Sequence, residues 1–559
     1  MHGTDQVMPI PAPLPMAKQA FNRAPEQQRE MRKKSLPDIL WRIAAFAPAI
    51  LMTISLSIAI QQRFAEGGVT WAEGTVVALV AITFIWVSLS VSTVLVGLAR
   101  RALNPCITRY SRRHALPQTV ALLVPIYNES AADVFGNASA MLKELAQGPK
   151  KDKFTLYILI DTRDEAIAEQ ELQALSALRA HAPDGVEAFY RRRADNTDKK
   201  VGNLTEWIQN WGGAYEAMIV LDADSLMSGA AIRQLAHELA AHPEAGLIQS
   251  FPALIGAQSL FGRMQQFSNA VYGWLLAEGL ATWYQNEGNY WGHNAIIRTK
   301  AFADSAHLPY LRGRRGRQDL IMSHDFVEAG MLRRAGWAVR FMPRAGGSYE
   351  EAPQTLIDYA LRDRRWCQGN MQHLRLLFAR GFHPVSRFHL LQGAVAFLLS
   401  PAWFALILIW SLIGAMPKEA LDPIHAANPF YPVGPNNQQP VGGVIFLACI
   451  YAMLLMPKIT GMLALSTNAR TRADYGGWLK FAGTALLEIL LSVIYAPVLM
   501  VQQTIAVVFA TLGRSMSWIP QNRQNTGYTW GQTLRFHWVE TVIGIAMLGG
   551  IFVLSLIHI

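Results

Sequence analysis

The sequence predicts an α/β domain inserted into a bundle of transmembrane α-helices, and three observations support this fold class. The 559-residue chain is 51% hydrophobic and only 16% charged, which is typical of a protein that lipid partly covers. Its long apolar stretches all lie towards the two ends of the chain. Between 118 and about 370, short runs rich in leucine and β-branched residues alternate with helical stretches, as they do in α/β domains.

The first 36 residues are polar, proline-rich and basic, and we expect residues 1–36 to form a disordered cytoplasmic tail. The segment 37–100 is predicted to hold two transmembrane helices. Its apolar stretches 40–60 and 75–99 are each long enough to cross about 30 Å of hydrocarbon. Several arginines follow the second stretch, so the positive-inside rule places the tail and the next domain in the cytoplasm.

The net charge of +10 indicates a lipid bilayer rather than nucleic acid as the partner, because many basic residues flank apolar stretches. Cys106, Cys367 and Cys449 are separated by long intervals. Neither a disulfide framework nor a zinc site is therefore predicted.

The cytosolic domain is assigned to 101–385. Three buried strands are predicted within it, at 120–125, 155–160 and 218–221, and each ends in polar residues. Ligands of an open parallel sheet bind beyond the carboxyl ends of its strands. We therefore expect one crevice to collect the polar residues that follow the three strands.

The segment 386–559 is predicted to return to the membrane, with spans at 390–415, 441–464 and 539–556. The stretch 483–512 is ambiguous because polar residues interrupt it. It could cross the membrane or lie along its surface, and we favour the surface position. The interrupting residues are Glu488, Pro497, Gln502 and Gln503.

Two carboxylates directly follow the third predicted strand. Asp222 and Asp224 stand at i and i+2, so an extended backbone projects them to the same side. Oxygen ligands of this kind suit Mg²⁺ or Mn²⁺, which share their other positions with water and substrate phosphates. The pattern predicts a metal-bridged diphosphate, although acidic pairs after a strand also form ordinary turns or helix caps.

Other polar residues in the same region suit a nucleotide. The turn after the first strand could stack Tyr127 on a base, while Glu129 and Asp161 accept hydrogen bonds from the base or its sugar. Lys200, close to Gly202, offers a cation for a phosphate. The alternatives are ordinary turn chemistry and a solvated surface.

Taken in order, these motifs resemble family-2 glycosyltransferases with the GT-A fold, the family that includes cellulose, chitin and hyaluronan synthases. The segments that carry the resemblance are 124–129, Asp161, 199–203 and 222–224. The resemblance implies a GT-A cytosolic domain in which Asp222 and Asp224 hold Mg²⁺ or Mn²⁺. It also implies that the sugar nucleotide is bound by Pro125, Tyr127, Glu129, Asp161, Lys200 and Asp222.

The segment 291–298 looks like the family's glycine-rich element near the donor sugar and the acceptor entrance. This likeness implies acceptor contacts for His293 and Asn294. His293 is interpreted as a polar lining residue, because no second His or Cys stands at metal-ligand spacing.

Ser323-His324-Asp325-Phe326 occupies the position of the family's catalytic acid motif, usually Glu-Asp, with His324 in place of the Glu. The resemblance implies that Asp325 is the general base of an inverting transfer. Asp319, six residues earlier, is the rival candidate.

The segment 362–370 resembles the Gln-x-x-Arg-Trp signature of processive members, except that Arg362 stands where the Gln belongs. The signature implies that Trp366 stacks on the acceptor sugar and that Arg365 faces the diphosphate. Further on, 513–525 occupies the place of the family's gating loop. That place implies that Arg514, Trp518 and Arg523 help to close the site.

Within the family, the segments 323–329, 347–351 and 362–370 are most similar to the inner-membrane glucosyltransferases of osmoregulated periplasmic glucan synthesis. The resemblance implies inverting transfer from UDP-glucose to a growing β-1,2-linked glucan acceptor, release into the periplasm, and a periplasmic glucan-processing partner. The alternatives are a cellulose-like processive synthase, a lipid-linked sugar transferase, and a non-enzymatic transporter or scaffold that binds a nucleotide.

Overall fold

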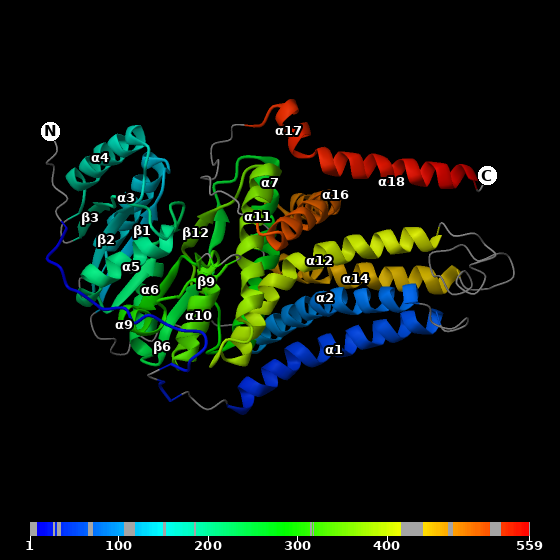
Figure 1. Cartoon of the computed structure of the whole chain (residues 1–559), viewed down its shortest axis with the longest axis horizontal. Helices are drawn as coiled ribbons and strands as arrows, with labels where there is room; N and C mark the ends of the chain where they lie inside the picture. The colour runs from blue at the N-terminus through cyan, green and yellow to red at the C-terminus, as the bar shows by residue number, and fades with distance from the viewer. Residues whose placement is uncertain are drawn as a thin grey trace.

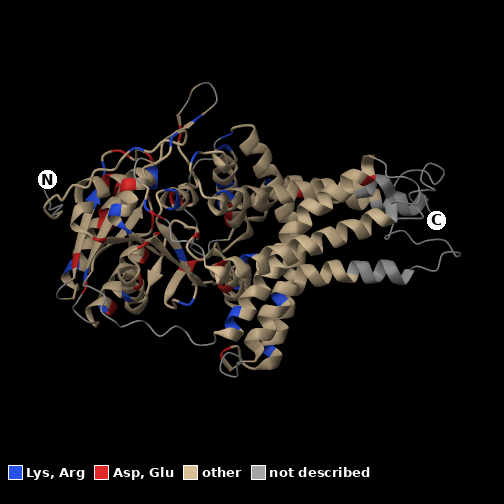
Figure 2. Ribbon diagram, turned by 90° about the horizontal axis from the view of Figure 1, so that it is seen from below, with Lys and Arg blue, Asp and Glu red and all other residues tan. Residues whose placement is uncertain are grey.

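The chain consists of an α/β domain from which a set of long helices extends (Figure 1). Charged residues are found mostly in the α/β domain, whereas the long helices carry few of them (Figure 2). The computed structural model describes residues 8–25, 28–30, 35–64, 71–104, 118–148, 152–183, 186–313, 316, 318–414, 440–467, 473–514 and 527–557.

The α/β domain is built on a seven-stranded sheet with the strand order β11-β6-β8-β4-β1-β2-β3. β1 is parallel to β2 and β4, β2 is parallel to β3, and β6 is parallel to β11, whereas β8 is antiparallel to both β4 and β6. The strands are β1 (Thr119–Ile126), β2 (Lys153–Ile160), β3 (Glu187–Arg192), β4 (Ala217–Val220), β6 (Ala245–Ser250), β8 (Ala295–Arg298) and β11 (Ala338–Met342). The three predicted strands are confirmed as β1, β2 and β4.

Alternation along the strands explains the two layers of helices around this sheet. In β1, Val120 and Leu122 pack into the core on one face, and Ala121 and Leu123 pack into the core on the other. One face is covered by α3 (Ala131–Ala146), α4 (Glu165–Ala180) and α6 (Gly229–Ala241). The other face is covered by α5 (Lys199–Trp211), α9 (Thr299–Ser305) and α10 (His324–Arg334).

Two smaller sheets complete the domain. β5 (Leu226–Met227), β12 (Ser348–Glu351) and β7 (Ala253–Ile255) form a three-stranded sheet, and β9 (Leu311–Arg312) pairs with β10 (Gln318–Asp319). Ser250 Oγ at the end of β6 donates a hydrogen bond of 2.9 Å to Ser348 Oγ at the start of β12. This bond joins the small sheet to the carboxyl end of the large one.

The prediction of a disordered tail is wrong for the described part of 1–36. The Ala12 N–H donates to Asn210 O at 2.9 Å, and the side chain of Met16 is buried in the core beneath α5 and α9. The Arg29 guanidinium lies 4.0 Å from the centre of the Trp337 ring. Prolines need no partner for a backbone N–H, so an extended proline-rich segment can pack wherever its few apolar side chains find a core.

Helices α7 (Leu260–Ser268), η3 (Asn269–Gly273, a π-helical turn) and α8 (Trp274–Tyr284) join the α/β domain to the long helices. α8 packs closely on α2: a Cβ added to Gly97 would collide with Leu275 O, and one added to Gly279 would collide with Thr93 O. Such close backbone approach requires glycine at both positions. Beside this contact, Arg344 binds both carboxylate oxygens of Glu278.

Glu287, just after α8, is a buried carboxylate shared between the two parts of the protein. Arg42 from α1 donates to Glu287, and Arg333 from α10 lies 3.2 Å from it. The backbone carbonyl of Glu287 also contacts His389 Nε2 in α12 at 2.9 Å. One residue therefore links two long helices to the α/β domain.

Five helices are long and apolar enough to cross a membrane, which makes this a membrane protein. Four of these helices contain the predicted spans 40–60, 75–99, 390–415 and 441–464, although residue 415 itself is not described. The fifth contains most of the ambiguous stretch 483–512. The five helices are α1 (Leu36–Phe64), α2 (Trp71–Leu103), α12 (Pro384–Gly414), α14 (Pro440–Ser466) and α16 (Trp478–Thr511). α17 (Trp530–Phe536) and the apolar α18 (Trp538–Ile557) follow.

The polar residues of α16 have partners within the protein. Glu488 accepts hydrogen bonds from Lys458 Nζ at 2.8 and 3.0 Å and from Tyr272 Oη at 2.7 Å. Gln503 Nε2 donates to Asp363 at 2.7 Å. Because these groups are satisfied inside the protein, they no longer argue against a crossing helix. Whether α16 crosses the membrane or lies on it stays a prediction.

Candidate functional site

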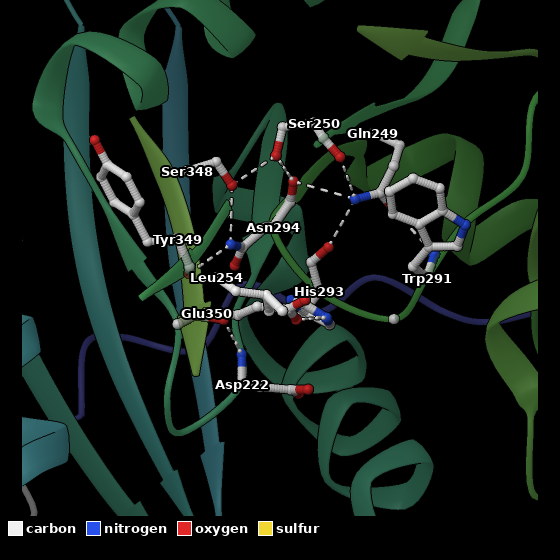
Figure 3. A network of polar contacts seen from close by, with 12 residues as sticks. Asp222, Gln249, Ser250, Leu254, Trp291, His293, Asn294, Ser348, Tyr349 and Glu350 are labelled. Carbon is white, nitrogen blue, oxygen red and sulfur yellow. Dashed lines mark hydrogen bonds and ion pairs between the residues drawn. The ribbon is translucent and has the colours of Figure 1, made fainter. Parts of the chain in front are cut away.

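The candidate site lies at the edge of the large sheet where β1, β2 and β4 end. Tyr127 and Asp161 directly follow β1 and β2, and Asp222 stands two residues after the end of β4. β8 runs in the opposite direction, so the segment 291–294 that precedes it reaches the same edge. Figure 3 shows Asp222, His293, Asn294 and Glu350 gathered there. The expected crevice therefore forms, and the antiparallel β8 adds residues to it.

Asp222 and Asp224 both remain partly exposed, whereas Leu221, Ala223 and Ser225 between and beside them are buried. This alternation agrees with the expected projection of the two carboxylates to one side. Lys200, in the first turn of α5, makes an ion pair with Asp222.

The same Lys200 ammonium donates a hydrogen bond of 2.9 Å to the Gly292 carbonyl. Gly292 has a φ of +88°, a conformation that glycine adopts without strain. Lys200, Asp222 and the glycine-rich segment therefore meet at one point.

His293 lies beside this point, and its Nε2 is 3.1 Å from a carboxylate oxygen of Glu350 in β12. Burial acts to lower the pKa of His293, but the charge of Asp222 and the hydrogen bond to Glu350 outweigh it and raise the pKa to about 9. The ring is thus an imidazolium at neutral pH.

Asn294 does not line an open surface, which corrects the expected acceptor contact. Its side chain is fully buried, and Nδ2 donates to Ser348 Oγ at 2.9 Å and to Tyr349 O at 3.1 Å. Asn294 instead holds β12 against the glycine-rich segment and so fixes Glu350 beside His293 (Figure 3).

Asp161 is also less accessible than its expected role in binding the sugar nucleotide requires. Its two carboxylate oxygens accept hydrogen bonds of 2.6 and 2.7 Å from Arg193, and both side chains are about 5% exposed. Arg193 further donates to Thr197 O and Lys199 O, just before Lys200. The sequence analysis missed Arg193, which stands in a run of three arginines that reads as a solvated surface.

Asp325 lies in the first turn of α10, with the Gly292 backbone between it and the Lys200 ammonium. Burial raises the pKa of the Asp325 carboxyl, and the neighbouring His324 partly opposes that shift. His324 Nδ1 is itself 2.8 Å from Glu328 on the next turn. A buried carboxyl with a raised pKa, next to the crevice, suits a general base.

Asp319, the rival base, lies in β10 away from these groups. It is 38% exposed and makes a long ion pair of 3.9 Å with Arg375. Asp319 contacts none of the residues described above around Asp325, so the geometry favours Asp325 as the base.

Helix α11 (Leu356–His373) lies over the crevice and carries the Arg-Trp signature. The Trp366 ring is 50% exposed, which leaves a face for a sugar ring, and the Arg362 guanidinium lies 4.5 Å from its centre. Burial lowers the pKa of Arg365, whereas the charge of Glu129 raises it, which places Arg365 near the turn after β1. α11 therefore brings Arg365 close to the turn after β1.

The expected gating residues are described only in part. Arg514 lies three residues after the end of α16, with its guanidinium 5.4 Å from the centre of the Phe509 ring, and it lines a small hollow together with Arg364 and Gln368. Trp518 and Arg523 lie outside the described residues.

The carboxylates of Asp222 and Asp224 fit a divalent cation that completes its shell from a substrate. They offer only oxygen, are partly exposed and project to one side, as Mg²⁺ or Mn²⁺ prefers. Among the described residues, no cluster of three or more His, Cys, Asp and Glu could hold a metal alone. A metal at this site would thus need phosphate oxygens and water as further ligands.

Comparison with known families agrees with this geometry. The profile described as "Glycosyl transferase family 2" matches residues 121–305, and the one described as "Glycosyl transferase family group 2" matches residues 217–458. The matched segments hold the sheet, the paired carboxylates, the glycine-rich segment and α11. The α/β domain thus has the GT-A fold expected of this family.

Full-length relatives are similar over nearly the whole chain. The "Glucans biosynthesis glucosyltransferase H" of Rhodopseudomonas palustris is 37% identical over 98% of this chain and 76% of its own length. The protein of the same name from Xanthomonas campestris pv. campestris is 36% identical over 97% of this chain and 84% of its own length.

A solved structure with a similar fold is the mannosyltransferase PcManGT from Pyrobaculum calidifontis, in complex with GDP-Man and Mn²⁺. It is 14% identical, with a TM-score of 0.43, and the match covers 70% of this chain and 98% of that one.

Proposed function

The chain belongs to the glucans biosynthesis glucosyltransferase H family, a membrane branch of glycosyltransferase family 2, and on this premise we propose that it transfers glucose from UDP-glucose to a growing β-1,2-linked glucan. The transfer inverts the configuration at C1 of the glucose. The acceptor is the glucan chain itself, so the enzyme acts processively, and the product leaves towards the periplasm for osmoregulated glucan synthesis.

The observation that carries this proposal is the position of Asp325. Its buried carboxyl borders Gly292, whose carbonyl accepts a hydrogen bond from Lys200. A sugar diphosphate held by Lys200 would present C1 to an acceptor hydroxyl on the side of Asp325. The Asp325 carboxylate takes the proton of that hydroxyl as the oxygen attacks C1, and UDP leaves from the opposite face.

Other residues bind and orient the two substrates. Tyr127 and Glu129 receive the nucleotide, Arg365 faces the diphosphate, and Trp366 stacks on the terminal sugar of the acceptor. Asp222 and Asp224 would hold Mg²⁺ or Mn²⁺, which supplies charge stabilisation for the departing diphosphate. The arginines after α2 support, by the positive-inside rule, an orientation with the α/β domain on the cytoplasmic side of the inner membrane.

The test is UDP release from UDP-glucose by purified full-length protein in membranes, followed by linkage analysis of the product. Asp325→Asn keeps the shape of the side chain and removes the base, so turnover should fall about 10²- to 10⁴-fold while UDP affinity stays near the native value. Asp319→Asn is the matched control and should keep native turnover.

Three results would count against the proposal. Turnover that survives in Asp325→Asn would move the base elsewhere. A product holding a single lipid-linked sugar would favour a lipid-linked sugar transferase. Linkages other than 1,2 would favour another polysaccharide synthase of this family.

A further inference from the structure

Helix α11 places Arg362 on the same face as Arg365 and Trp366, because residues three and four apart are neighbours on a helix. Arg362 stands where the signature of the resembling processive enzymes has a glutamine. The substitution adds a permanent positive charge to the helix that covers the crevice.

The Arg362 guanidinium is held by aromatic rings and lacks an acceptor. Its Cζ lies 4.5 Å from the centre of the Trp366 ring and 5.4 Å from that of Tyr359. Its Nε is buried and has no hydrogen-bond partner among the described residues. A buried N–H without an acceptor is unfavourable, so a bound ligand that supplies an acceptor would be stabilised.

The charges around Arg362 indicate where that ligand lies. Burial lowers the pKa of Arg362, and the charges of Glu350 and Asp224 act in the opposite direction, which places the guanidinium on the side of the paired carboxylates. Burial is the main cause that lowers the pKa of Arg365; the charge of Arg362 lowers it further, and the charge of Glu129 raises it. The two guanidinium groups thus carry like charges about one helical turn apart.

An anion beside Arg362 would supply the acceptor that its Nε lacks and would relieve its repulsion with Arg365. We propose that Arg362 and Arg365 together clamp the diphosphate of the sugar nucleotide, and that Arg362 is a substrate-binding residue whose charge a glutamine would not supply. Planar guanidinium groups bind phosphate oxygens in pairs, which suits this geometry. The inference rests on the proposed function, and it implies that UDP binds measurably even without a divalent metal.

The experiment is a binding titration of purified full-length protein in detergent with EDTA present, using UDP and uridine as probes. Arg362→Gln should weaken UDP binding about tenfold or more, the change expected on losing a charge-assisted hydrogen bond, and should leave uridine binding unchanged. Arg362→Lys, which keeps the charge but not the fork, should give an intermediate UDP affinity.

Arg364→Gln is the matched control. Arg364 lies on the same helix and is also partly buried, but it donates to Gln502 in α16 and stacks on Phe536, away from the crevice. Its replacement should leave UDP affinity unchanged. Thermal unfolding of each variant distinguishes lost binding from lost folding.

Equal UDP affinity in native protein and Arg362→Gln would overturn the inference and leave Arg362 as a brace for Trp366. A parallel loss of uridine and UDP binding would also overturn it, because the residue would then shape the pocket without contacting phosphate. Native binding that requires Mg²⁺ would refute the metal-independent clamp. Native protein that binds no UDP under any condition would instead refute the proposed function.

Discussion

Replacing Arg193 is expected to destabilise the α/β domain and to weaken nucleotide binding together. Arg193 binds both oxygens of Asp161 at the end of β2, and the two side chains are almost fully buried. It also donates to Thr197 O at 3.1 Å and to Lys199 O at 3.0 Å. One guanidinium therefore connects the sheet edge to the segment that presents Lys200.

The magnitude follows from the burial of the pair. Breaking a buried ion pair by removing one partner leaves an uncompensated charge and costs about 3 to 5 kcal/mol. Arg193→Met keeps much of the side-chain volume, so most of that cost comes from the unpaired Asp161. For a domain of this size, about 2 to 4 °C is lost per kcal/mol, which gives a fall of about 10 °C in the melting temperature.

The assay is thermal unfolding of full-length protein in detergent across a double-mutant cycle. Asp161→Asn combined with Arg193→Met removes both charges and should recover most of the lost stability. Arg192→Met is the matched control: its partner Glu165 is 80% exposed, so the melting temperature should not change. UDP affinity should fall in Arg193→Met because Lys200 is no longer held in place.

Two results would refute this reasoning. The first is an Arg193→Met variant as stable as the native protein, which would mean that the pair contributes nothing. The second is simple additivity in the cycle, which would mean that the two residues act independently. Native UDP affinity in a destabilised Arg193→Met variant would mean that Arg193 stabilises the fold but does not position Lys200.

Three further predictions concern other buried charges. Glu287→Ala should lower the melting temperature by the equivalent of about 3 kcal/mol or more, because it removes the carboxylate that neutralises Arg42 and Arg333; an unchanged melting temperature would contradict this. With a chelator present, the free energy of unfolding should decline as pH rises from about 6.5 through 9, by at most about 3 kcal/mol, because the raised pKa of His293 stabilises the fold only while the ring is charged. Glu350→Gln should make this decline shallower. A decline as steep as that of the native protein would refute the assignment. Glu488→Leu should lower the stability of the long helices in thermal unfolding, and adding Lys458→Met should restore that stability. If the second substitution restores nothing, the two residues do not act as a pair.

The sheet and the position of the site could be predicted from the sequence because both depend on local patterns. Apolar runs of about six residues mark buried strands, and the order of strands in an α/β domain brings their carboxyl ends together. Asp222 was found in this way, Lys200 was found as a cation close to a glycine, and Asp325 was found through the family resemblance; the structure brings their neighbourhoods to one place. The antiparallel β8 was not predicted, because neither composition nor spacing reveals strand direction.

The remaining differences arise from partners that lie far away in the sequence. Glu488 and Gln503 read as interruptions of an apolar stretch, yet Lys458 and Asp363 satisfy them. Asn294 stands in a segment that suggests a binding surface, but its partners in β12 bury it. The N-terminal segment has the composition of a disordered tail, and its signal for packing was a few apolar side chains among the prolines. Each of these outcomes depends on tertiary contacts that single-sequence patterns do not contain.

The backbone contact between Gly97 and Gly279 affects how this protein could be recombined with its relatives. The change in polarity near residue 100 suggests a natural joint at which one catalytic module could be exchanged for another. The two glycines lie on opposite sides of that joint, and a methyl group added to either one would collide with the backbone of the facing helix. A chimaera cut at that point would have to match both surfaces at once. The smallest unit that can be transplanted intact therefore includes α2 together with the α/β domain.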